Sequence, residues 1–248
     1  MKLLVFKSKK EAVRKACSEV QNLISRKPNA VLGLATGGTM VPFYKELVKL
    51  CKKGKIDLTK VTTFNLDEYA GLNHSDKNSY HYYMNKNFFS KVGITKSKTN
   101  FPSVSGSDYD KKIKRAGGLD LCMLGIGRNG HIAFNEPGSS FKSRTRKVEL
   151  TEDTIKANSR YFKTVSRVPR EAYTMGIATI MNSKKIILLA FGEKKSSAIA
   201  RVMKGKVSES VPASILRRHK DATLIANSRA ASQLSHAAVR LQVAHNKT

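Results

Sequence analysis

The stretch AVLGLATGGTMVPFYKELVKLCKK, residues 30–53, decides the fold class of this chain. Its first six residues form a short apolar run, which predicts a buried β-strand over Ala30–Ala35. Two adjacent glycines then allow a tight turn, and the amphipathic segment that follows predicts a helix over Val41–Lys53. A strand that passes through a turn directly into a helix is the unit from which parallel sheets are built.

The same alternation continues along the chain. Short apolar runs predict further strands at 2–6, 61–65, 119–124, 172–177, 185–190 and 222–225. Amphipathic segments predict helices at 9–25, 79–89, 194–204 and 212–218, and a final helix from residue 228 that frays at residue 246. We therefore predict an α/β fold: an open, mostly parallel, twisted sheet with helices on both faces, Rossmann-like, with residues 1–248 as a single domain.

The composition excludes several classes of protein. The chain has 248 residues and is 40% hydrophobic, which is enough for a substantial core. No stretch approaches the ~20 apolar residues of a membrane helix, and lysines interrupt the first apolar run, so we expect neither a membrane span nor a secretory signal. The odd number of scattered cysteines resembles neither a disulfide framework nor a metal site. We expect a cytoplasmic protein without a metal.

The net charge is unusual. Lys and Arg number 46 against 18 Asp and Glu, which gives +28. Such a balance raises nucleic acid as a partner. However, the basic residues are spread along the chain, aromatic residues are 7%, and there is no Trp to build a base-stacking platform. We therefore expect a small anionic molecule as the partner and not nucleic acid, and we interpret the charge as a lysine-rich surface.

Ligands of open parallel sheets bind beyond the carboxyl ends of the strands, so the segments that follow strands are the places to look. The first is Ala35-Thr-Gly-Gly-Thr39. Its glycines let backbone amides approach a ligand, its threonines add hydroxyl donors, and the next helix adds its positive end, which together suit a phosphate. The alternative is a tight turn in which Thr39 is the helix N-cap. The segment matches neither a Walker loop nor a dinucleotide fingerprint, so no nucleotide cofactor is expected.

The second segment places Asp67 and Glu68 at the end of a buried strand. A carboxylate there can act as a general base beside a bound substrate, or it can cap the next element.

The third segment is LGIGRNGHIAFNEPGSSF, residues 124–141. Three glycines indicate an unusual backbone, His131 follows them at once, and Glu136 comes five positions later. A His within reach of a Glu is a tunable proton carrier, although a lone His is more often structural.

Together these segments closely resemble the glucosamine-6-phosphate deaminase family. The matching strings run in order over nearly the whole chain: LGLATGGT (32–39), TTFNLDEYAGL (62–72), NSYHYYM (78–84), residues 124–141 above, SRTR (143–146), ANSRYF (157–162), VPREAYTMGIATI (168–180), FGEKKSSAI (191–199) and VPASIL (211–216). HIAFNEP is a specific string. The related lactonases share the Gly-Gly turn and the Gly-His but lack Asn-Glu-Pro.

The resemblance implies a conversion of glucosamine 6-phosphate and water to fructose 6-phosphate and ammonium, as part of amino sugar catabolism and without a cofactor. It implies that His131 opens the sugar ring, that Glu136 orients and charges His131, and that Asp67 moves a proton between carbons 2 and 1. It implies substrate binding by Thr36, Gly37, Gly38, Thr39, Arg160 and Lys195.

Two departures from the family pattern bear on the chemistry. Asn129 stands where many members carry Asp. The resemblance implies that Asn129 is a catalytic residue together with His131. Its side chain can orient His131 but cannot supply charge. Val148 stands where activator-regulated members carry a Lys, which argues against allosteric activation. Three readings remain as alternatives: a 6-phosphogluconolactonase-like enzyme, another sugar-phosphate isomerase of the same fold, or a degenerate enzyme that binds nucleic acid. A monomer and a homo-oligomer both fit the sequence.

Overall fold

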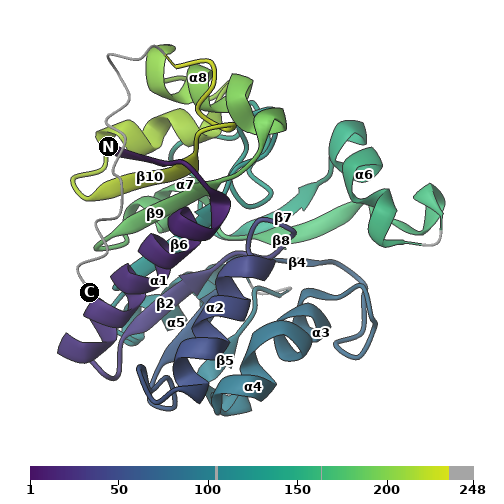
Figure 1. The fold of residues 1–248 in the computed structure, drawn as a ribbon. Helices are drawn as coiled ribbons and strands as arrows, with labels where there is room; N and C mark the ends of the chain where they lie inside the picture. The colour runs from purple at the N-terminus through teal and green to yellow at the C-terminus, as the bar shows by residue number, and fades with distance from the viewer. Residues whose placement is uncertain (104–105, 163, 235–248) are drawn as a thin grey trace.

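The computed structural model describes residues 1–103, 106–162 and 164–234. Within these residues, seven parallel strands form the main sheet in the order β1-β10-β9-β6-β2-β3-β5 (Figure 1). The strands are β1 (Lys2–Phe6), β2 (Val31–Leu34), β3 (Thr62–Asn65), β5 (Thr99–Asn100), β6 (Leu121–Gly125), β9 (Ile186–Ala190) and β10 (Ala222–Asn227). The predicted parallel sheet is confirmed.

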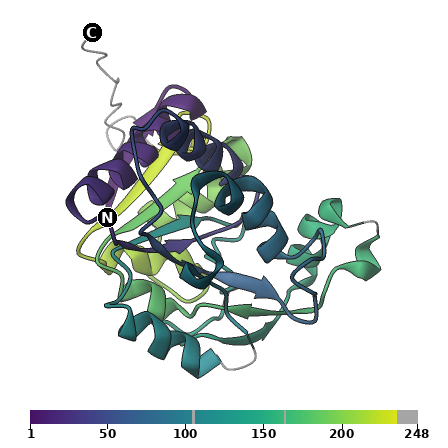
Figure 2. The ribbon, with the colours of Figure 1, turned by 90° about the horizontal axis from the view of Figure 1, so that it is seen from below.

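Strand β9 shows why the central strands form where the sequence predicts them. All five of its residues are apolar and buried, because β9 lies between β6 and β10 and is covered on both faces. Figure 2 shows α1 (Lys9–Arg26) and α2 (Val41–Lys52) on one face of the sheet and α5 (Gly106–Arg115) on the other, as predicted for helices on both faces. The core lies between these layers and the sheet.

Helix α1 illustrates how local sequence sets a helix start. Ser8 accepts a hydrogen bond from the Glu11 amide at 3.2 Å, and Glu11 accepts one from the Ser8 amide at 2.9 Å, a capping box. The buried side chains that follow repeat at helical spacing and face the sheet and α2: Ala12, Val13, Ala16, Cys17, Val20 and Ile24.

A second, smaller sheet projects from the side of the main one (Figure 1). It is antiparallel and has the order β4 (Asp67–Tyr69), β8 (Glu171–Thr174), β7 (Arg146–Glu149). Between β7 and β8 the chain forms α6 (Glu152–Asn158), η3 (Ser159–Tyr161) and η4 (Val165–Arg167). This projection, residues 146–174, packs around a separate core of Tyr69, Phe134, Leu150, Ile155, Val168 and Ala172.

Several predicted elements differ from those observed. The strand predicted at 172–177 is β8, which is antiparallel and belongs to the small sheet. The helix predicted at 79–89 changes from α3 (Tyr80–Met84) to a π-helical turn, η1 (Asn85–Phe89), and the helix predicted at 212–218 is the 3₁₀ helix η6 (Pro212–Arg218). Residues 228–234 form turns, and the rest of the predicted final helix lies outside the described residues.

The remaining elements are α4 (Ser90–Val92), η2 (Lys96–Lys98), α7 (Ile177–Met181), η5 (Glu193–Lys195) and α8 (Ser196–Lys204). Helices α5, α6 and α7 and the strands β4, β5 and β7 had no counterpart among the predicted elements. No helix in the described part of the chain combines the length and the apolar character that a membrane crossing requires.

Candidate active site

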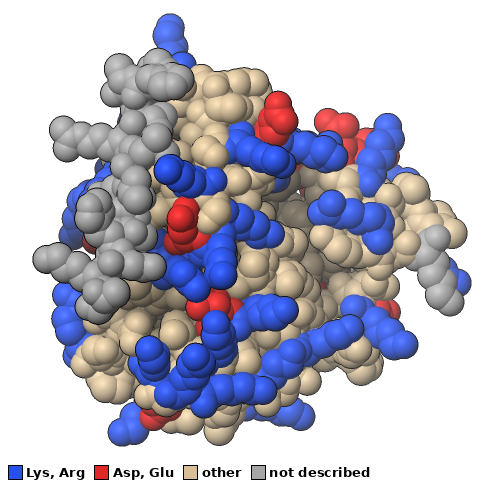
Figure 3. Space-filling view, in the orientation of Figure 1, with Lys and Arg blue, Asp and Glu red and all other residues tan. Residues whose placement is uncertain are grey.

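The sequence segments singled out above meet at one edge of the main sheet. Strands β6, β2 and β3 are neighbours, and all of them are parallel, so their carboxyl ends lie side by side. The loop with His131 leaves β6, the Gly-Gly turn leaves β2, and Asp67 follows β3. Figure 3 shows a hollow between the main body and the projection, with Lys and Arg side chains around it.

The Gly-Gly turn is held by its neighbours. Gly37 has a φ of 93°, which favours glycine, and its carbonyl accepts a hydrogen bond from the Tyr83 hydroxyl at 2.8 Å. The N-cap of α2 is Met40 and not Thr39, and within the described residues no side chain caps this helix. Pro42 has no amide proton, but the amides of Val41 and Phe43 have no side-chain cap among the described residues and remain available to an anion, which favours the phosphate interpretation of the turn.

Three basic side chains gather near the end of β6. Lys195 lies in η5 after β9, and its ammonium donates to the Ile126 carbonyl at 2.6 Å. Burial, followed by the charges of Arg128 and Arg160, lowers the pKa of Lys195 to about 8. The three cations therefore lie close together, and an anion among them would restore the protonated form of Lys195.

The projection reaches back over the turn at this point. Arg160 lies in η3, and its guanidinium stacks on the ring of Tyr161, 4.7 Å from the centroid. The Tyr161 hydroxyl lies 3.4 Å from the point that a Cβ on Gly38 would occupy. Arg160 and the Gly-Gly turn, which are far apart in the chain, therefore border the same space.

Asp67 is the first residue of β4 and is 6% exposed. Its Oδ1 has no hydrogen-bond partner among the described residues. Burial, and then the charge of Glu68, raises the pKa of Asp67 to about 8. A carboxyl group whose pKa lies near neutrality can both take up and return a proton, as the predicted base requires.

Phenol groups surround this carboxyl group. Four tyrosines lie close enough to Asp67 for its charge to raise their pKa values. They are Tyr44 on α2, Tyr69 on β4, Tyr80 on α3 and Tyr109 on α5. Burial raises the pKa of all four phenols, so they stay neutral and add no charge beside Asp67.

Glu68 has the capping role, which the sequence left open as the alternative to catalysis. Its carboxylate accepts hydrogen bonds from the Tyr80 and His81 amides at 2.9 Å each, so it caps the start of α3. Of the two adjacent acids, Asp67 keeps an oxygen without a partner among the described residues, whereas Glu68 is occupied by hydrogen bonds.

Asn129, His131 and Glu136 come together in the loop after β6. The His131 Nδ1 lies 3.2 Å from the Glu136 carboxylate, and the Asn129 side-chain amide donates to the same carboxylate at 2.5 Å. The Asn129 side-chain oxygen accepts from the His131 amide at 3.2 Å. Burial would raise the pKa of Glu136, but hydrogen bonding and charge from His131 and hydrogen bonds from Thr154 and Asn129 outweigh it and lower that pKa. Glu136 therefore stays ionised and can support a charged imidazole.

Two glycines make this loop possible. A Cβ on Gly127 would overlap the His131 ring, so only glycine leaves room for the imidazole. Gly130 has a φ of 92°, and a Cβ there would lie 2.8 Å from Val211.

Asn135 connects the loop to the projection. Its side-chain amide donates to the carbonyls of Ile132 at 3.0 Å and Met175 at 2.8 Å, and its oxygen accepts from Arg146 at 2.9 Å. The side chain is fully buried, so these bonds fix where Glu136, the next residue, points.

Sequence reasoning missed three groups of this site. Thr154, on α6, donates a hydrogen bond from its hydroxyl to Glu136. Arg128 joins Lys195 and Arg160, and Tyr83 holds the Gly37 carbonyl. Arg128 stands inside the quoted motif and could have been found there, whereas nothing in the sequence connects α6 or α3 to the strand ends.

The described residues hold no group of three or more His, Cys, Asp and Glu side chains that could bind a metal ion.

Known proteins share the sequence and the fold of this chain. The family model for glucosamine-6-phosphate isomerases/6-phosphogluconolactonase matches residues 7–225. Proteins named glucosamine-6-phosphate deaminase from Clostridium botulinum (strain Langeland) and Thermoanaerobacter sp. (strain X514) are both 46% identical; each match covers 94% of this chain, and 99% and 94% of the relative.

Two solved structures extend the comparison. One, described as a monomeric glucosamine-6-phosphate deaminase, has a TM-score of 0.91 at 44% identity and covers 94% of this chain and 99% of its own. A 6-phosphogluconolactonase from Thermotoga maritima, at 21% identity and a TM-score of 0.71 over 91% of this chain and 97% of its own, shares the fold. The chain belongs to the glucosamine-6-phosphate isomerase/6-phosphogluconolactonase family.

Proposed function

We propose that this chain is a glucosamine-6-phosphate deaminase, which converts glucosamine 6-phosphate and water to fructose 6-phosphate and ammonium. The observation that carries the proposal is that the Asn129–His131–Glu136 group after β6 and the buried carboxyl of Asp67 after β3 lie at the same edge of the main sheet, on either side of β2, and that the His131 loop also carries Arg128 of the basic cluster. The 46% identity to proteins with that name supports it.

In this proposal the phosphate of the substrate is bound by Thr36, Gly37, Gly38, Thr39, Arg160 and Lys195, with Arg128 as an additional cation. The uncapped amides of α2 and the lowered pKa of Lys195 support this part, because both favour a bound anion. Dianion binding would neutralise the mutual repulsion of the three cations and hold the sugar at one end.

His131 acts on the ring. It moves a proton from the anomeric hydroxyl to the ring oxygen, so that the C1–O5 bond breaks and an open-chain aldehyde forms. Glu136 stabilises the imidazolium form during this step, and Asn129 holds the backbone of His131 and one oxygen of Glu136. Asn129 thus orients without supplying a charge.

Asp67 then acts on carbon. As a carboxylate it removes the C2 proton, the electron pair moves to the C1 oxygen, and that oxygen takes up a proton from the substrate's ammonium group to give an enolamine. Asp67 then returns the C2 proton to C1. This makes an iminium at C2, and water adds to it and displaces ammonium to leave the ketone. The buried position of Asp67 and its raised pKa support the role, since the group must both accept and return one proton.

We further propose that residues 1–248 act as one domain, that the protein works in the cytoplasm, and that it is a monomer. The last point is supported by the 44% identical structure, which is described as that of a monomeric enzyme. Size-exclusion chromatography with light scattering distinguishes a 27.5 kDa monomer from any homo-oligomer.

The second candidate, a 6-phosphogluconolactonase-like activity, has less support. The lactonase from Thermotoga maritima is 21% identical and shares the fold alone. The side chains of Asn135 and Glu136, which the lactonase pattern lacks, hold the His131 loop together in this chain.

The test is ammonium release from glucosamine 6-phosphate, compared with release from unphosphorylated glucosamine and with hydrolysis of 6-phosphogluconolactone. We expect release from the phosphorylated amino sugar and more than about 100-fold less by an Asp67→Asn protein purified in parallel, which controls for contaminating enzymes. No ammonium release by the purified protein, or lactone hydrolysis in its place, would remove the proposed function.

A further inference from the structure

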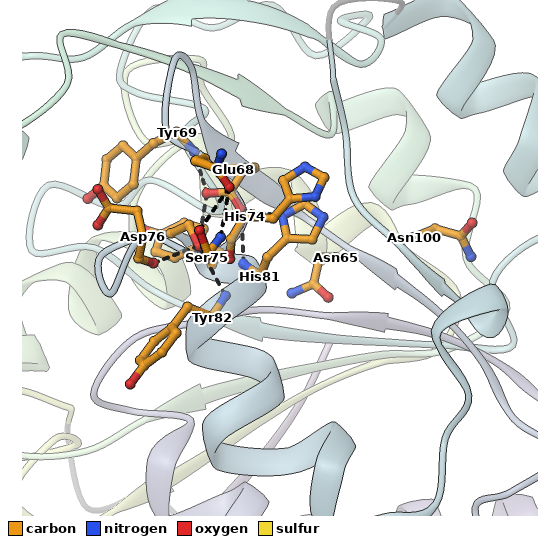
Figure 4. A network of polar contacts seen from close by, with 12 residues as sticks. Asn65, Glu68, Tyr69, His74, Ser75, Asp76, His81, Tyr82 and Asn100 are labelled. Carbon is orange, nitrogen blue, oxygen red and sulfur yellow. Dashed lines mark hydrogen bonds and ion pairs between the residues drawn. The ribbon is translucent and has the colours of Figure 1, made fainter.

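The second acid of the Asp67–Glu68 pair is tied into the protein by several hydrogen bonds at once. Glu68 is 5% exposed. Its Oε1 accepts from the amides of Tyr69 at 2.8 Å and Tyr80 at 2.9 Å, and its Oε2 accepts from the amide of His81 at 2.9 Å (Figure 4). The same Oε2 lies 2.7 Å from the His81 ring Nδ1. This carboxylate is therefore fully used in joining β4 to the first turn of α3.

The His81 ring is held on both faces. It stacks on His74 with a centroid distance of 3.6 Å and an interplanar angle of 13°, and on Phe101 at 3.6 Å and 22°. Figure 4 shows the His74 and His81 rings lying over one another beside Glu68. The two stacks hold the plane of the ring, and in this plane its Nδ1 contacts Glu68.

Helix α3 carries the position of Glu68 onward to the phosphate end of the site. Tyr83, two residues after His81, donates to the Gly37 carbonyl in the Gly-Gly turn at 2.8 Å. Tyr80, whose amide Glu68 binds, contacts the side chains of Thr36 and Tyr69. The chain of contacts thus runs from Glu68 through α3 to Thr36 and Gly37 of the turn.

In the other direction, Glu68 is covalently next to Asp67. Glu68 is the second residue of the short strand β4, and its Oε1 accepts a hydrogen bond from the amide of Tyr69, the third residue. This bond restrains the backbone of β4. A displacement of Glu68 therefore moves the proposed base and the proposed phosphate site together.

We propose that Glu68, held by His81, is a positioning residue that sets the distance between the Asp67 carboxyl and the phosphate-binding turn. This inference rests on the proposed function. It assigns Glu68 no contact with the substrate and no proton transfer.

The chain offers a matched control. Glu11 also caps a helix, α1, and accepts from a backbone amide at 2.9 Å, but it lies on the exposed capping box of a helix that carries no proposed site residue. Glu68→Gln and Glu11→Gln make the same chemical change at the start of a helix. In Glu68→Gln the new NH₂ group faces the amides of Tyr69 and Tyr80 or the amide of His81, so that at least one buried hydrogen bond is lost.

The kinetic test measures kcat and KM separately for both variants. We expect Glu68→Gln to lower kcat by about 10- to 100-fold, since a shift of about 1 Å at a reacting group has that effect, and to raise KM by about 3- to 10-fold. Glu11→Gln should keep both constants within about twofold of the wild-type values. Values for Glu68→Gln within that same range, or the same losses in Glu11→Gln, would overturn the proposal.

A second measurement separates positioning from simple loss of stability. The affinity for inorganic phosphate, measured by calorimetry, does not require turnover, so it remains readable even if the protein releases no ammonium and the proposed function fails. We expect Glu68→Gln and Tyr83→Phe each to weaken phosphate binding, and the double variant to bind hardly more weakly than either, because both act through the same contact. Fully multiplicative losses would mean that Glu68 does not act through Tyr83.

The histidine supplies a rescue experiment. His81→Phe keeps an aromatic ring between His74 and Phe101 but removes the Nδ1 contact, whereas His81→Asn keeps a polar donor near the Nδ1 position and loses the stack. If His81 holds Glu68 through Nδ1, kcat falls further in His81→Phe than in His81→Asn. The opposite order would assign the role of His81 to stacking alone and overturn its part of the proposal.

Discussion

The main sheet and the projection contribute to the site in different ways. The main sheet supplies groups whose neighbours are close in the chain: Asn129, His131 and Glu136 lie in one loop and bond to one another. The projection, with its separate core, supplies Arg160 and Thr154, which reach the site from a distance in sequence. The main sheet thus contributes site residues that are close together in the sequence, and the projection adds site residues from a distant segment.

The boundary between these two regions is densely bonded. The Met175 amide donates to the Leu66 carbonyl at 2.6 Å, and the Phe134 amide donates to the Thr174 hydroxyl at 3.0 Å. On the other side Asp110, on α5, accepts from the hydroxyls of Thr145 and Thr179. Asp67 lies at this boundary, because β4 follows β3 after one residue but pairs with β8. The proposed base therefore depends on both regions.

The largest expected effect comes from Asp67→Asn at this boundary. Ammonium release should fall by about 10³-fold or more, because an amide cannot accept the C2 proton. A rate within about tenfold of wild type would show that another group is the base.

The same substitution should stabilise the fold in a pH-dependent manner. Burial and Glu68 raise the pKa of Asp67 from 3.8 to about 8, so between these values the folded state keeps a proton that the unfolded chain has lost, and stability falls as pH rises. Asn removes this loss. In melting experiments at about pH 8, Asp67→Asn should raise the free energy of unfolding by about 1–3 kcal/mol and the melting temperature by roughly 2–10 °C. The gain should vanish near about pH 4; an equal gain at both pH values would contradict the ionisation argument.

His131→Ala tests the group of Asn129, His131 and Glu136 on the main sheet. We expect a loss of about 10²- to 10⁴-fold in kcat/KM with an unchanged circular dichroism spectrum, because the imidazole is half-buried and its removal leaves Glu136 with its other two hydrogen bonds. Supplying the open-chain form would bypass ring opening, so substrates that open faster should be less affected. Equal kinetics for the variant and the wild type would remove His131 from the mechanism.

The contribution of the projection is isolated by Thr154→Val, which removes the hydroxyl that donates to Glu136 and keeps the shape of the side chain. We expect kcat to fall by about 10-fold, the effect of one charge-assisted hydrogen bond of roughly 1.5 kcal/mol, with KM nearly unchanged. Thr164→Val is the control, since its hydroxyl lies on the exposed part of the projection and contacts Ser166. If both variants behave alike, the projection does not act through Glu136.

The smallest expected effect is on the pH profile. In the free enzyme Asp67 must lose its proton and Lys195 must keep one, and the pKa of each is about 8. The kcat/KM profile should therefore be a narrow bell centred near about pH 8. Lys195→Arg should remove the alkaline limb and leave the acid limb, because a guanidinium stays charged. An alkaline limb that persists in this variant would belong to a different group.

The sequence predicted most reliably where one local pattern was sufficient. The apolar run of β9, the turn at residues 36–39 and the spacing of His131 to Glu136 are each complete within about ten residues, and the structure contains the corresponding elements. The strand predicted at 172–177 shows the limit. Residues 172–174 lie in β8, but residues 175–176 are outside it and Ile177 begins α7. The partners of β8 are β7 and β4, and so short a strand carries no signal for which sheet it joins.

By itself, the sequence determined the α/β class and the His131–Glu136 pair, because hydrophobic period and glycine placement act over neighbouring residues, and its ordered strings carried the resemblance to the family. The tertiary structure alone decided that Asp67 keeps an oxygen without a partner among the described residues while Glu68 caps α3, and that Thr154 and Arg128 join the site. The physical reason is that burial, hydrogen-bond partners and nearby charges are set by elements that pack together across long stretches of chain, and two adjacent acids look the same until those partners are in place.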